Sequence, residues 1–291
     1  FGAFLIISAV GIFFGILFGG GAYLQNLSFA GMFSQHPKGL PFIPVFFITV
    51  ACGILSGFHA TQNTLIARTV SSEKEGKMTF YNMMLVEGFI AMCWAGGAMV
   101  LFGKGTDMAT GATLMVGLVS RDFLGNIGAI FAIIGVIVLP ITSGDTAFRG
   151  LRLMVAEQFN IDQTSTQKRV SLSIAFFIPA AVILYIAKTN PAGFSILWRY
   201  FAFTNQFVAT FALATISIYL YINGKNYLVS LIPGTFYFFV TLSFIFNAQI
   251  GFNLPWSIAY ILGALCCVGY VWFVRQRATV QKDQIVQNVL S

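Results

Sequence analysis

Residues 124–142 read LGNIGAIFAIIGVIVLPIT, a continuous apolar run without a single charged side chain. The hydrocarbon core of a bilayer is about 30 Å thick, and a helix of about 20 apolar residues is needed to cross it. Lipid offers no hydrogen-bond partners to an open backbone, so a spanning segment of this kind satisfies its peptide groups within a helix. This stretch therefore predicts a transmembrane α-helix.

Runs of the same kind recur along the chain. Hydrophobic residues make up 57% of the sequence and charged residues 9%, whereas about a quarter of an average soluble domain is charged. The apolar runs predict about eight spans, at 1–24, 41–66, 79–103, 124–142, 170–187, 194–222, 227–247 and 254–274. No alternating ten-residue pattern of a membrane barrel occurs. We expect an all-α, polytopic transmembrane bundle over 1–274, followed by a polar and partly disordered cytoplasmic tail over 275–291.

The net charge of +7 has a topological explanation. Five basic residues follow the odd-numbered predicted spans, and eleven follow the even-numbered ones, namely Arg68, Lys74, Lys77, Arg149, Arg152, Lys168, Arg169, Lys225, Arg275, Arg277 and Lys282. Cytoplasmic loops of membrane proteins carry the excess of Lys and Arg. We therefore expect both ends of this segment in the cytoplasm and no nucleic-acid partner.

The cysteines and histidines do not form the pattern of a metal site. All four cysteines fall inside predicted spans, and the chain has two histidines, so neither a disulfide framework nor zinc spacing is present. We expect no metal and no cofactor. The chain opens at Phe1, already within an apolar run, and we expect further helices upstream of it.

A polar stripe marks the second predicted span. On one helix over 41–66, spacings of three and four residues place a set of polar side chains on a single face: Thr49, Cys52, Ser56, His59 and Asn63, with Gln62 beside them. Histidine changes charge near physiological pH and is uncommon inside membranes. The stripe predicts a lining that faces a cavity, with His59 handling protons. The alternative is that the hydroxyls bond their own backbone and His59 bonds a neighbouring helix.

Two carboxylates also lie within or beside predicted spans. An ionisable residue at the centre of a membrane helix costs about 2.5–3.5 kcal/mol on insertion scales. Glu87, about two turns inside 79–103, is therefore a candidate proton carrier, or else a neutral carboxyl group that links two helices. Asp145 follows Ser143 in the segment PITSGDT, where Pro and Gly predict a helix break. Asp145 then either caps the next helix or belongs to a discontinuous-helix site for an ion or anionic substrate.

Polar residues also occur deep in the predicted span 194–222. Asn205 and Gln206 are followed by Thr210 and Ser217, and the last three lie on nearly one face. They line a pathway or clasp a neighbouring helix, and the pattern does not separate these two roles. Arg199, between two aromatic residues near the outer end, is interpreted as a side chain that reaches the lipid headgroups.

Three of these stretches resemble the carbon starvation protein CstA family of bacterial inner-membrane transporters. They are ITVACGILSGFHATQ at 48–62, TSGDTA at 142–147, and WRYFA at 198–202 followed by Asn205 and Gln206. The resemblance extends from about residue 41 to the tail. It implies uptake of peptides or of pyruvate, the latter coupled to protons, by a protein of the amino acid–polyamine–cation superfamily with an inverted-repeat, LeuT-like core. It also implies a further N-terminal membrane region.

The sequence thus predicts a secondary active transporter that takes up peptides or pyruvate across the bacterial inner membrane. His59 and Glu87 are the expected proton-handling residues, and Asp145 with Ser143 the expected broken-helix site. Sodium coupling and the oligomeric state stay open. We considered two alternatives, an intramembrane aspartyl protease and a sensor. The protease reading rests on Ser143-Gly144-Asp145 but finds Thr142 and Tyr81-Asn82 where its motifs need Gly and Tyr-Asp, and we expect no enzyme.

Overall fold

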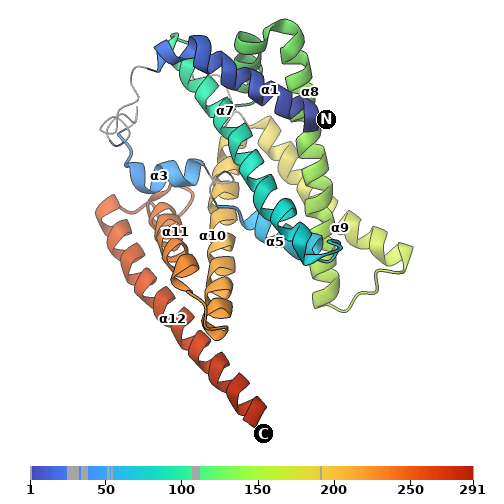
Figure 1. Cartoon of the computed structure of the whole chain (residues 1–291), viewed down its shortest axis with the longest axis vertical. Coiled ribbons are helices and arrows are strands. Elements are labelled where there is room, and N and C mark those ends of the chain that lie inside the picture. Colours follow the sequence, from blue (N-terminus) through green and yellow to red (C-terminus); the bar gives the residue numbers. More distant parts are fainter. Residues whose placement is uncertain are drawn as a thin grey trace. The chain divides into compact units, whose positions relative to one another are not determined.

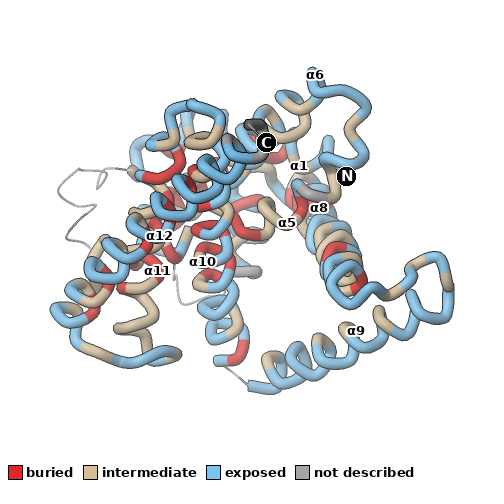
Figure 2. Tube along the Cα trace, turned by 90° about the horizontal axis from the view of Figure 1, so that it is seen from below, coloured by how far each residue is buried: buried red, intermediate tan, exposed pale blue. Residues whose placement is uncertain are grey.

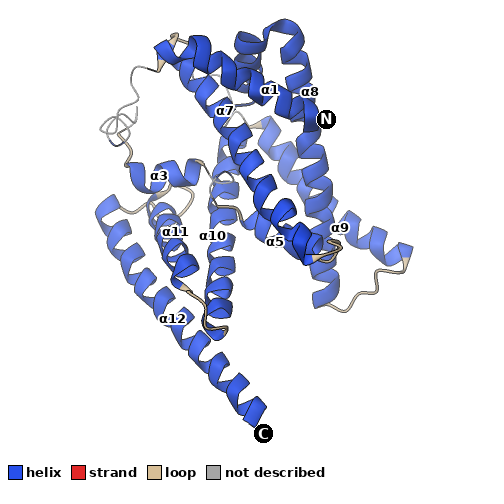
Figure 3. Cartoon of the chain, in the orientation of Figure 1, coloured by secondary structure: helices blue, strands red, loops and turns tan. Residues whose placement is uncertain are grey.

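The computed structural model describes residues 2–24, 33, 39–50, 53, 55–106, 112–190 and 192–290. Throughout these ranges the regular elements are helices, and no strand occurs in them (Figure 3). Seven helical segments there are long and apolar enough to cross a membrane: Gly2–Tyr23, Glu73–Gly103, Leu114–Gln158, Thr166–Thr189, Gly193–Ile222, Leu228–Asn247 and Trp256–Ile285. The predicted all-α, polytopic membrane fold is confirmed.

Figure 1 shows the helices, coloured along the chain. In chain order they are α1 (Gly2–Gly15), a π-helical turn (Ile16–Gly20), a 3₁₀ turn (Gly21–Tyr23), α3 (Phe42–Thr49), α5 (Gly57–Ala67), α6 (Glu73–Gly76), a second π-helical turn (Lys77–Asn82), α7 (Met83–Gly103), α8 (Ala112–Gln158), α9 (Thr166–Thr189), α10 (Gly193–Ile222), α11 (Leu228–Asn247) and α12 (Trp256–Leu290).

These elements form two compact units. Unit 1 comprises Phe1–Phe33 and Asn63–Ser173, and unit 2 comprises Ser34–Gln62 and Ile174–Ser291. In unit 1, α1 packs against α7 and α8 around a core that includes Ile12, Cys93 and Val119. A side chain at Gly97 would meet Val119 Cγ1 at 2.5 Å, so this close helix contact needs a residue without a Cβ.

Unit 2 is built on α10, α11 and α12, which lie side by side, with α3 against α10 and α11 (Figure 1). Buried residues concentrate on the facing sides of these helices (Figure 2). Two apolar clusters form the core: one at α3 with Ile48, Ala202 and Val240, and one farther along α10, where the Tyr270 hydroxyl donates to the Thr210 carbonyl at 2.8 Å. The large outward-facing apolar side chains are those expected to contact lipid.

The predicted single span over 41–66 is wrong. The chain forms two helices there, α3 and α5, and residues 50, 55 and 56 between them are not helical. The positions of Thr49, Ser56, His59 and Asn63 therefore do not share one helical face, because the rotation of 100° per residue does not hold across the break. Cys52, the remaining member of the stripe, lies outside the described residues.

The predicted helix break at residues 140–144 is also wrong. α8 continues through Pro140 and past Asp145 to Gln158, and the Thr146 hydroxyl donates to the Thr142 carbonyl at 2.9 Å. Proline removes its own N–H from the helix ladder and crowds the carbonyl four residues earlier, but the residues on both sides of Pro140 keep helical geometry. Asp145 is thus neither an N-cap nor part of a discontinuous helix. The departure from helical geometry in α8 is at Gly125, with φ 67° and ψ −173°, a conformation that glycine tolerates.

The tail is helical as well. We expected a polar and partly disordered segment after residue 274, but α12 continues to Leu290. Residues 275–285 include two Arg, three Gln, one Ala and one Lys, and these four residue types have good helix propensity. A helix that is already nucleated by packing in the membrane extends into such a sequence at little cost.

Candidate functional site

The break between α3 and α5 is held by one side chain of α10. The side-chain carbonyl of Asn205 accepts the backbone N–H of Phe58 at 2.9 Å and the hydroxyl of Ser56 at 3.3 Å. Ser56 Oγ in turn accepts the backbone N–H of His59 at 3.3 Å. The first N–H groups of a helix have no partner within the helix. Here two side-chain oxygens satisfy the N–H groups of Phe58 and His59 at the start of α5.

Gly57 makes this close approach possible. A Cβ atom at this position would lie 2.3 Å from the backbone carbonyl oxygen of Asn205 and 2.8 Å from Val208 Cβ. Both neighbours belong to α10 and cannot move far without displacing that helix. The segment Ser56–Phe58 therefore combines a cap with a residue that has no side chain, and both features bring the start of α5 against α10.

The C-terminal half of α3 is hydrogen-bonded to Gln206, which follows Asn205 in α10. The Gln206 amide nitrogen donates to the backbone carbonyl of Phe47. Because a carbonyl can only accept, this bond fixes which end of the amide faces α3. Gln206 is fully buried, and its side-chain oxygen has no hydrogen-bond partner among the residues that the structure describes.

A second unpaired group lies beside Phe47. The hydroxyl of Tyr237 on α11 is buried, with no hydrogen-bond partner in the described parts of the chain. The Tyr237 ring lies edge-on to the ring of Phe47 with centroids 6.0 Å apart. A polar atom buried without a hydrogen bond costs about 1–3 kcal/mol. Gln206 and Tyr237 therefore place an unpaired acceptor and an unpaired hydroxyl around one residue at the end of the broken helix.

The candidate site carries little charge. Unit 2 contains seven basic residues and one acidic residue, Asp283, which lies near the end of α12. His59, a titratable side chain, is half-buried in the first turn of α5. No group of three metal-ligating side chains occurs among the residues that the structure describes.

The structure brings together only some of the predicted site residues. Ser56, His59, Asn205 and Gln206 meet at the α3–α5 break, and Gln62 is buried on the same half of α5. Other predicted residues lie elsewhere: Thr49 and Asn63 are exposed, and the Thr49 hydroxyl donates to the Val45 carbonyl of its own helix at 2.8 Å.

The predicted residues of α7 and α8 belong to unit 1. Glu87 is exposed on α7. Asp145 is exposed on α8 and accepts a hydrogen bond from Arg149, one turn later, at 2.6 Å. Ser143 is half-buried on the same helix. The roles of these three residues in transport stay predictions.

Tyr237 was not predicted. A signal was available in the sequence, because small and polar residues recur at spacings of four, three and four along α11 and form one buried face. These residues are Ser230, Gly234, Tyr237 and Thr241. The surrounding run is so apolar that the aromatic ring is easily read as core, and its hydroxyl draws attention only when its neighbours are known.

The fold and the site together define a multi-pass α-helical membrane protein whose second unit contains an interrupted helix with buried polar groups. A family model described as carbon starvation protein CstA matches residues 2–104 and 96–244. The chain belongs to this family.

Two relatives from Haemophilus influenzae are similar to this chain. An uncharacterized protein is 50% identical over 117 residues, which are 40% of this chain and 80% of the relative. An uncharacterized membrane protein is 35% identical over 109 residues, which are 32% of this chain and 29% of the relative. No solved structure matches the chain.

Proposed function

We propose that this chain is part of a secondary active transporter of the bacterial inner membrane that takes up a small organic solute. The observation that carries the proposal is the interruption between α3 and α5, held open by Asn205. Non-helical backbone is tolerated at membrane depth only where protein buries it or where it lines a cavity. In secondary transporters, discontinuous helices form the substrate and ion sites. Membership of the CstA family supports the same function.

The free groups at the break favour a solute that carries an amide. Gln206 offers an unpaired acceptor, and Tyr237 offers a hydroxyl that can donate. An amide presents one N–H and one C=O, which complement this pair. A carboxylate could use only the Tyr237 hydroxyl and would leave the Gln206 oxygen unpaired. Of the two solutes implied by the family resemblance, a short peptide therefore suits the site better than pyruvate.

Proton coupling is assigned to His59 and Glu87. His59 lies in the first turn of α5, directly after the residues that Asn205 caps, and imidazole exchanges a proton near neutral pH. Glu87 is a carboxylate well inside the long helical span Glu73–Gly103, where an ionisable residue is a functional candidate by default. Each acts in its own unit in this proposal.

Both ends of the segment are placed in the cytoplasm. α3 and α5 contain 8 and 11 residues, and at about 1.5 Å per residue they suffice together for one crossing of the bilayer. This interrupted crossing adds to the seven helical segments that could cross the membrane. With that number of crossings the eleven basic residues lie on one side, as the positive-inside rule requires.

Uptake of a labelled dipeptide into proteoliposomes under an imposed pH gradient tests the proposal. The protein should accumulate the dipeptide, and Tyr237→Phe and Gln206→Leu should each reduce uptake at least tenfold. Tyr200→Phe, which removes an exposed hydroxyl elsewhere on α10, serves as the control and should transport normally. If neither dipeptide nor pyruvate enters the vesicles under a proton or a sodium gradient, the transport proposal is wrong.

The same vesicles separate the coupling assignment from the transport activity. His59→Ala and Glu87→Gln should abolish accumulation driven by the pH gradient. Full gradient-driven uptake by both variants would refute the roles of these residues and leave the transporter itself intact. The alternative of an aspartyl protease needs two carboxylates that share a proton, whereas Asp145 is paired with Arg149. Cleavage of a model transmembrane peptide by the purified protein would support this alternative.

A further inference from the structure

A groove lies along α12, and Thr235 of α11 also lines it. It has a volume of about 580 Å³, which is within the range of small-molecule sites. One end is lined by Val268, Val271 and Trp272, and the other by Arg275, Gln276 and Thr279. The lining therefore changes from apolar to polar over about three turns of one helix.

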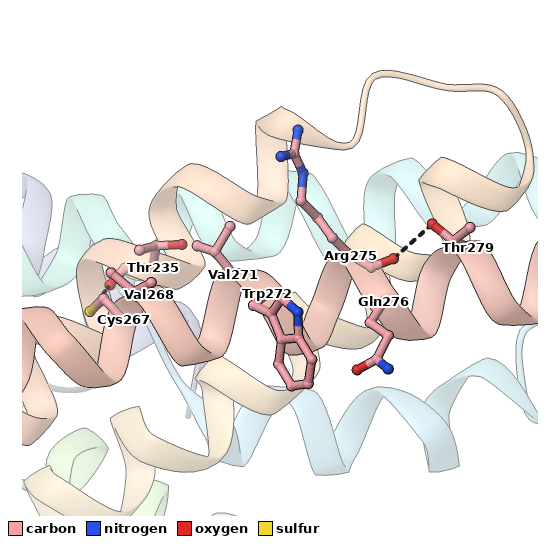
Figure 4. Close-up of a pocket in the computed structure, with 8 residues that line it drawn as sticks. All are labelled: Thr235, Cys267, Val268, Val271, Trp272, Arg275, Gln276 and Thr279. Atoms are coloured by element: carbon pink, nitrogen blue, oxygen red, sulfur yellow. Dashed lines mark hydrogen bonds between the residues drawn. The ribbon is translucent and has the colours of Figure 1, made fainter.

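Figure 4 shows the two edges of this groove. The Trp272 ring and the Gln276 side chain project to one side of α12, and the Arg275 guanidinium projects to the other. Thr235 of α11 and Cys267 close the apolar end, where the Cys267 thiol contacts the Thr235 carbonyl at 3.5 Å. Trp272 and Val268 are 64% and 70% exposed, so the apolar end is open to whatever surrounds α12.

Arg275 is held in place at the polar end. One of its terminal nitrogens donates to the Tyr227 hydroxyl at 3.2 Å. A guanidinium has five N–H donors in a planar fork, so this bond orients the group and leaves donors for a ligand. Gln276 and Thr279 add neutral polar groups, and the Thr279 hydroxyl is bonded to the Arg275 carbonyl at 3.0 Å.

The surroundings of the polar end are basic. The ammonium of Lys282 lies 5.4 Å from the centre of the Tyr221 ring, and the guanidinium of Arg277 lies 5.4 Å from that of Phe273. No acidic residue lines the groove, and the one carboxylate of unit 2, Asp283, follows Lys282 directly. The charge at this end of α12 therefore attracts an anion.

We propose that this groove binds an anionic phospholipid. Its phosphate contacts Arg275, and an acyl chain lies along Val268, Val271 and Trp272. The groove matches such a lipid in charge and in the order of its polar and apolar parts. Arg275 lies just beyond the apolar part of the helix, next to an exposed tryptophan, as groups at the membrane interface do. Basic pockets between membrane helices on the cytoplasmic side are suited to anionic headgroups.

The tryptophan in the groove reports directly on the lipid. Trp94, Trp198 and Trp256 are replaced by Phe, so that Trp272 alone fluoresces in the full chain. The protein is reconstituted in phosphatidylcholine with a small fraction of lipid whose acyl chains carry bromine, a contact quencher. Brominated phosphatidylglycerol should quench Trp272 at about fivefold lower mole fraction than brominated phosphatidylcholine, since one basic group at the surface contributes about 1 kcal/mol.

Two arginine variants test the assignment to the groove. Arg275→Gln should abolish the preference for phosphatidylglycerol. Arg277→Gln, which removes a charge of the same sign two residues away but outside the groove lining, should keep the preference. Inorganic phosphate and glycerol phosphate should not compete, because the acyl chain supplies part of the binding.

A second measurement covers the case in which the triple Phe variant does not fold. The unmodified chain in detergent should show a higher thermal midpoint with added phosphatidylglycerol than with phosphatidylcholine, and Arg275→Gln should lose this difference. Equal quenching by the two brominated lipids, or equal effects of the two arginine variants, would overturn the proposal. Absence of quenching by either lipid would also overturn it, because the groove would then be covered by protein.

Discussion

The side-chain carbonyl of Asn205 accepts the backbone N–H of Phe58 at 2.9 Å, although the two residues are 147 positions apart in the chain. This bond, with the contact of the same oxygen to Ser56, lets α5 begin in the middle of a segment that is apolar enough to form one continuous helix. The interrupted helix on which the proposed transport function rests therefore depends on α10 as much as on its own residues.

Removal of the Asn205 side chain should destabilise the protein by about 1–3 kcal/mol, because the buried N–H of Phe58 would lose its acceptor. The measurement is the thermal unfolding midpoint of Asn205→Ala in detergent. Thr204→Ala, at the exposed neighbouring position, is the control and should unfold like the parent protein. Equal midpoints for the two variants would show that Asn205 does not hold the break.

Two glycines should respond to alanine in opposite directions. At Gly57 the new methyl group would lie 2.3 Å from the backbone carbonyl oxygen of Asn205. At Gly144 nothing lies within 4 Å of the corresponding position. Gly57→Ala should lower stability by about 1–3 kcal/mol through overpacking. Gly144→Ala should raise it by up to about 1 kcal/mol through helix propensity. A destabilised Gly144→Ala protein would contradict the continuous helix that we describe for α8.

Loss of the Tyr237 hydroxyl should separate stability from transport. Tyr237→Phe removes a buried hydroxyl without a partner, so the free energy of unfolding should stay unchanged or rise. Tyr270→Phe is the matched variant, because it removes the hydroxyl that donates to the Thr210 carbonyl, and it should cost about 1 kcal/mol. If Tyr237→Phe destabilises the protein as much as Tyr270→Phe, its hydroxyl has a structural partner and is not free for a solute.

The Asp145–Arg149 pair should contribute little to stability. Both side chains are more than half exposed, and pairs of this kind one helical turn apart are worth about 0.3–0.5 kcal/mol. A double-mutant cycle with Asp145→Ala and Arg149→Ala measures this coupling. An effect of Asp145→Ala alone well above this range, near the cost of about 1 kcal/mol for a lost N-cap, would support the helix start that the sequence predicted at this position.

The loop between α8 and α9 should loosen in acid. Asp162 accepts the backbone N–H of Thr164 at 2.9 Å and its hydroxyl at 2.8 Å, and the first of these bonds is the main cause that lowers the pKa of Asp162 below its ordinary value. A lowered pKa in the folded state stabilises the turn above the ordinary value of about 3.9, and this contribution is lost as the pH falls through the lowered pKa.

Hydrogen exchange of the Thr164 amide measures this effect. Protection, corrected for the intrinsic exchange rate, should persist at pH 5 and decline below about pH 4. Asp162→Ala should show weak protection over the whole range and no such decline. A protection profile in the parent protein that does not change with pH would contradict the assignment.

The class of fold could be predicted from the composition and from the length of the apolar runs, because a backbone in lipid must satisfy its hydrogen bonds internally. The runs around Leu124 and Leu213 are apolar enough that only a helix can satisfy their peptide groups, and the structure has helices at both places. The helix ends were less predictable. Pro140 and Gly144 indicated a break that did not occur, since neighbouring residues keep the ladder intact, whereas Gly57 marks one that did.

The polar residues of the candidate site were recognisable one by one. Ser56, His59, Asn205 and Gln206 stand out in apolar surroundings because burying a polar group is costly. Their partners did not stand out, because a local pattern records only what lies three or four residues away. The bond from Gln206 to Phe47 spans 159 residues, and Tyr237 becomes notable only beside it.

By itself, the sequence determined that this protein is a helical bundle for a membrane, since the length and apolarity of each run follow from the thickness and dryness of the bilayer. It also determined which few polar side chains are costly to bury there. The tertiary structure alone decided where a helix is interrupted and which polar atoms find partners, because both depend on side chains of distant helices. That is why Asn205 came to cap α5, and why Gln206 and Tyr237 were left with unpaired atoms beside the break.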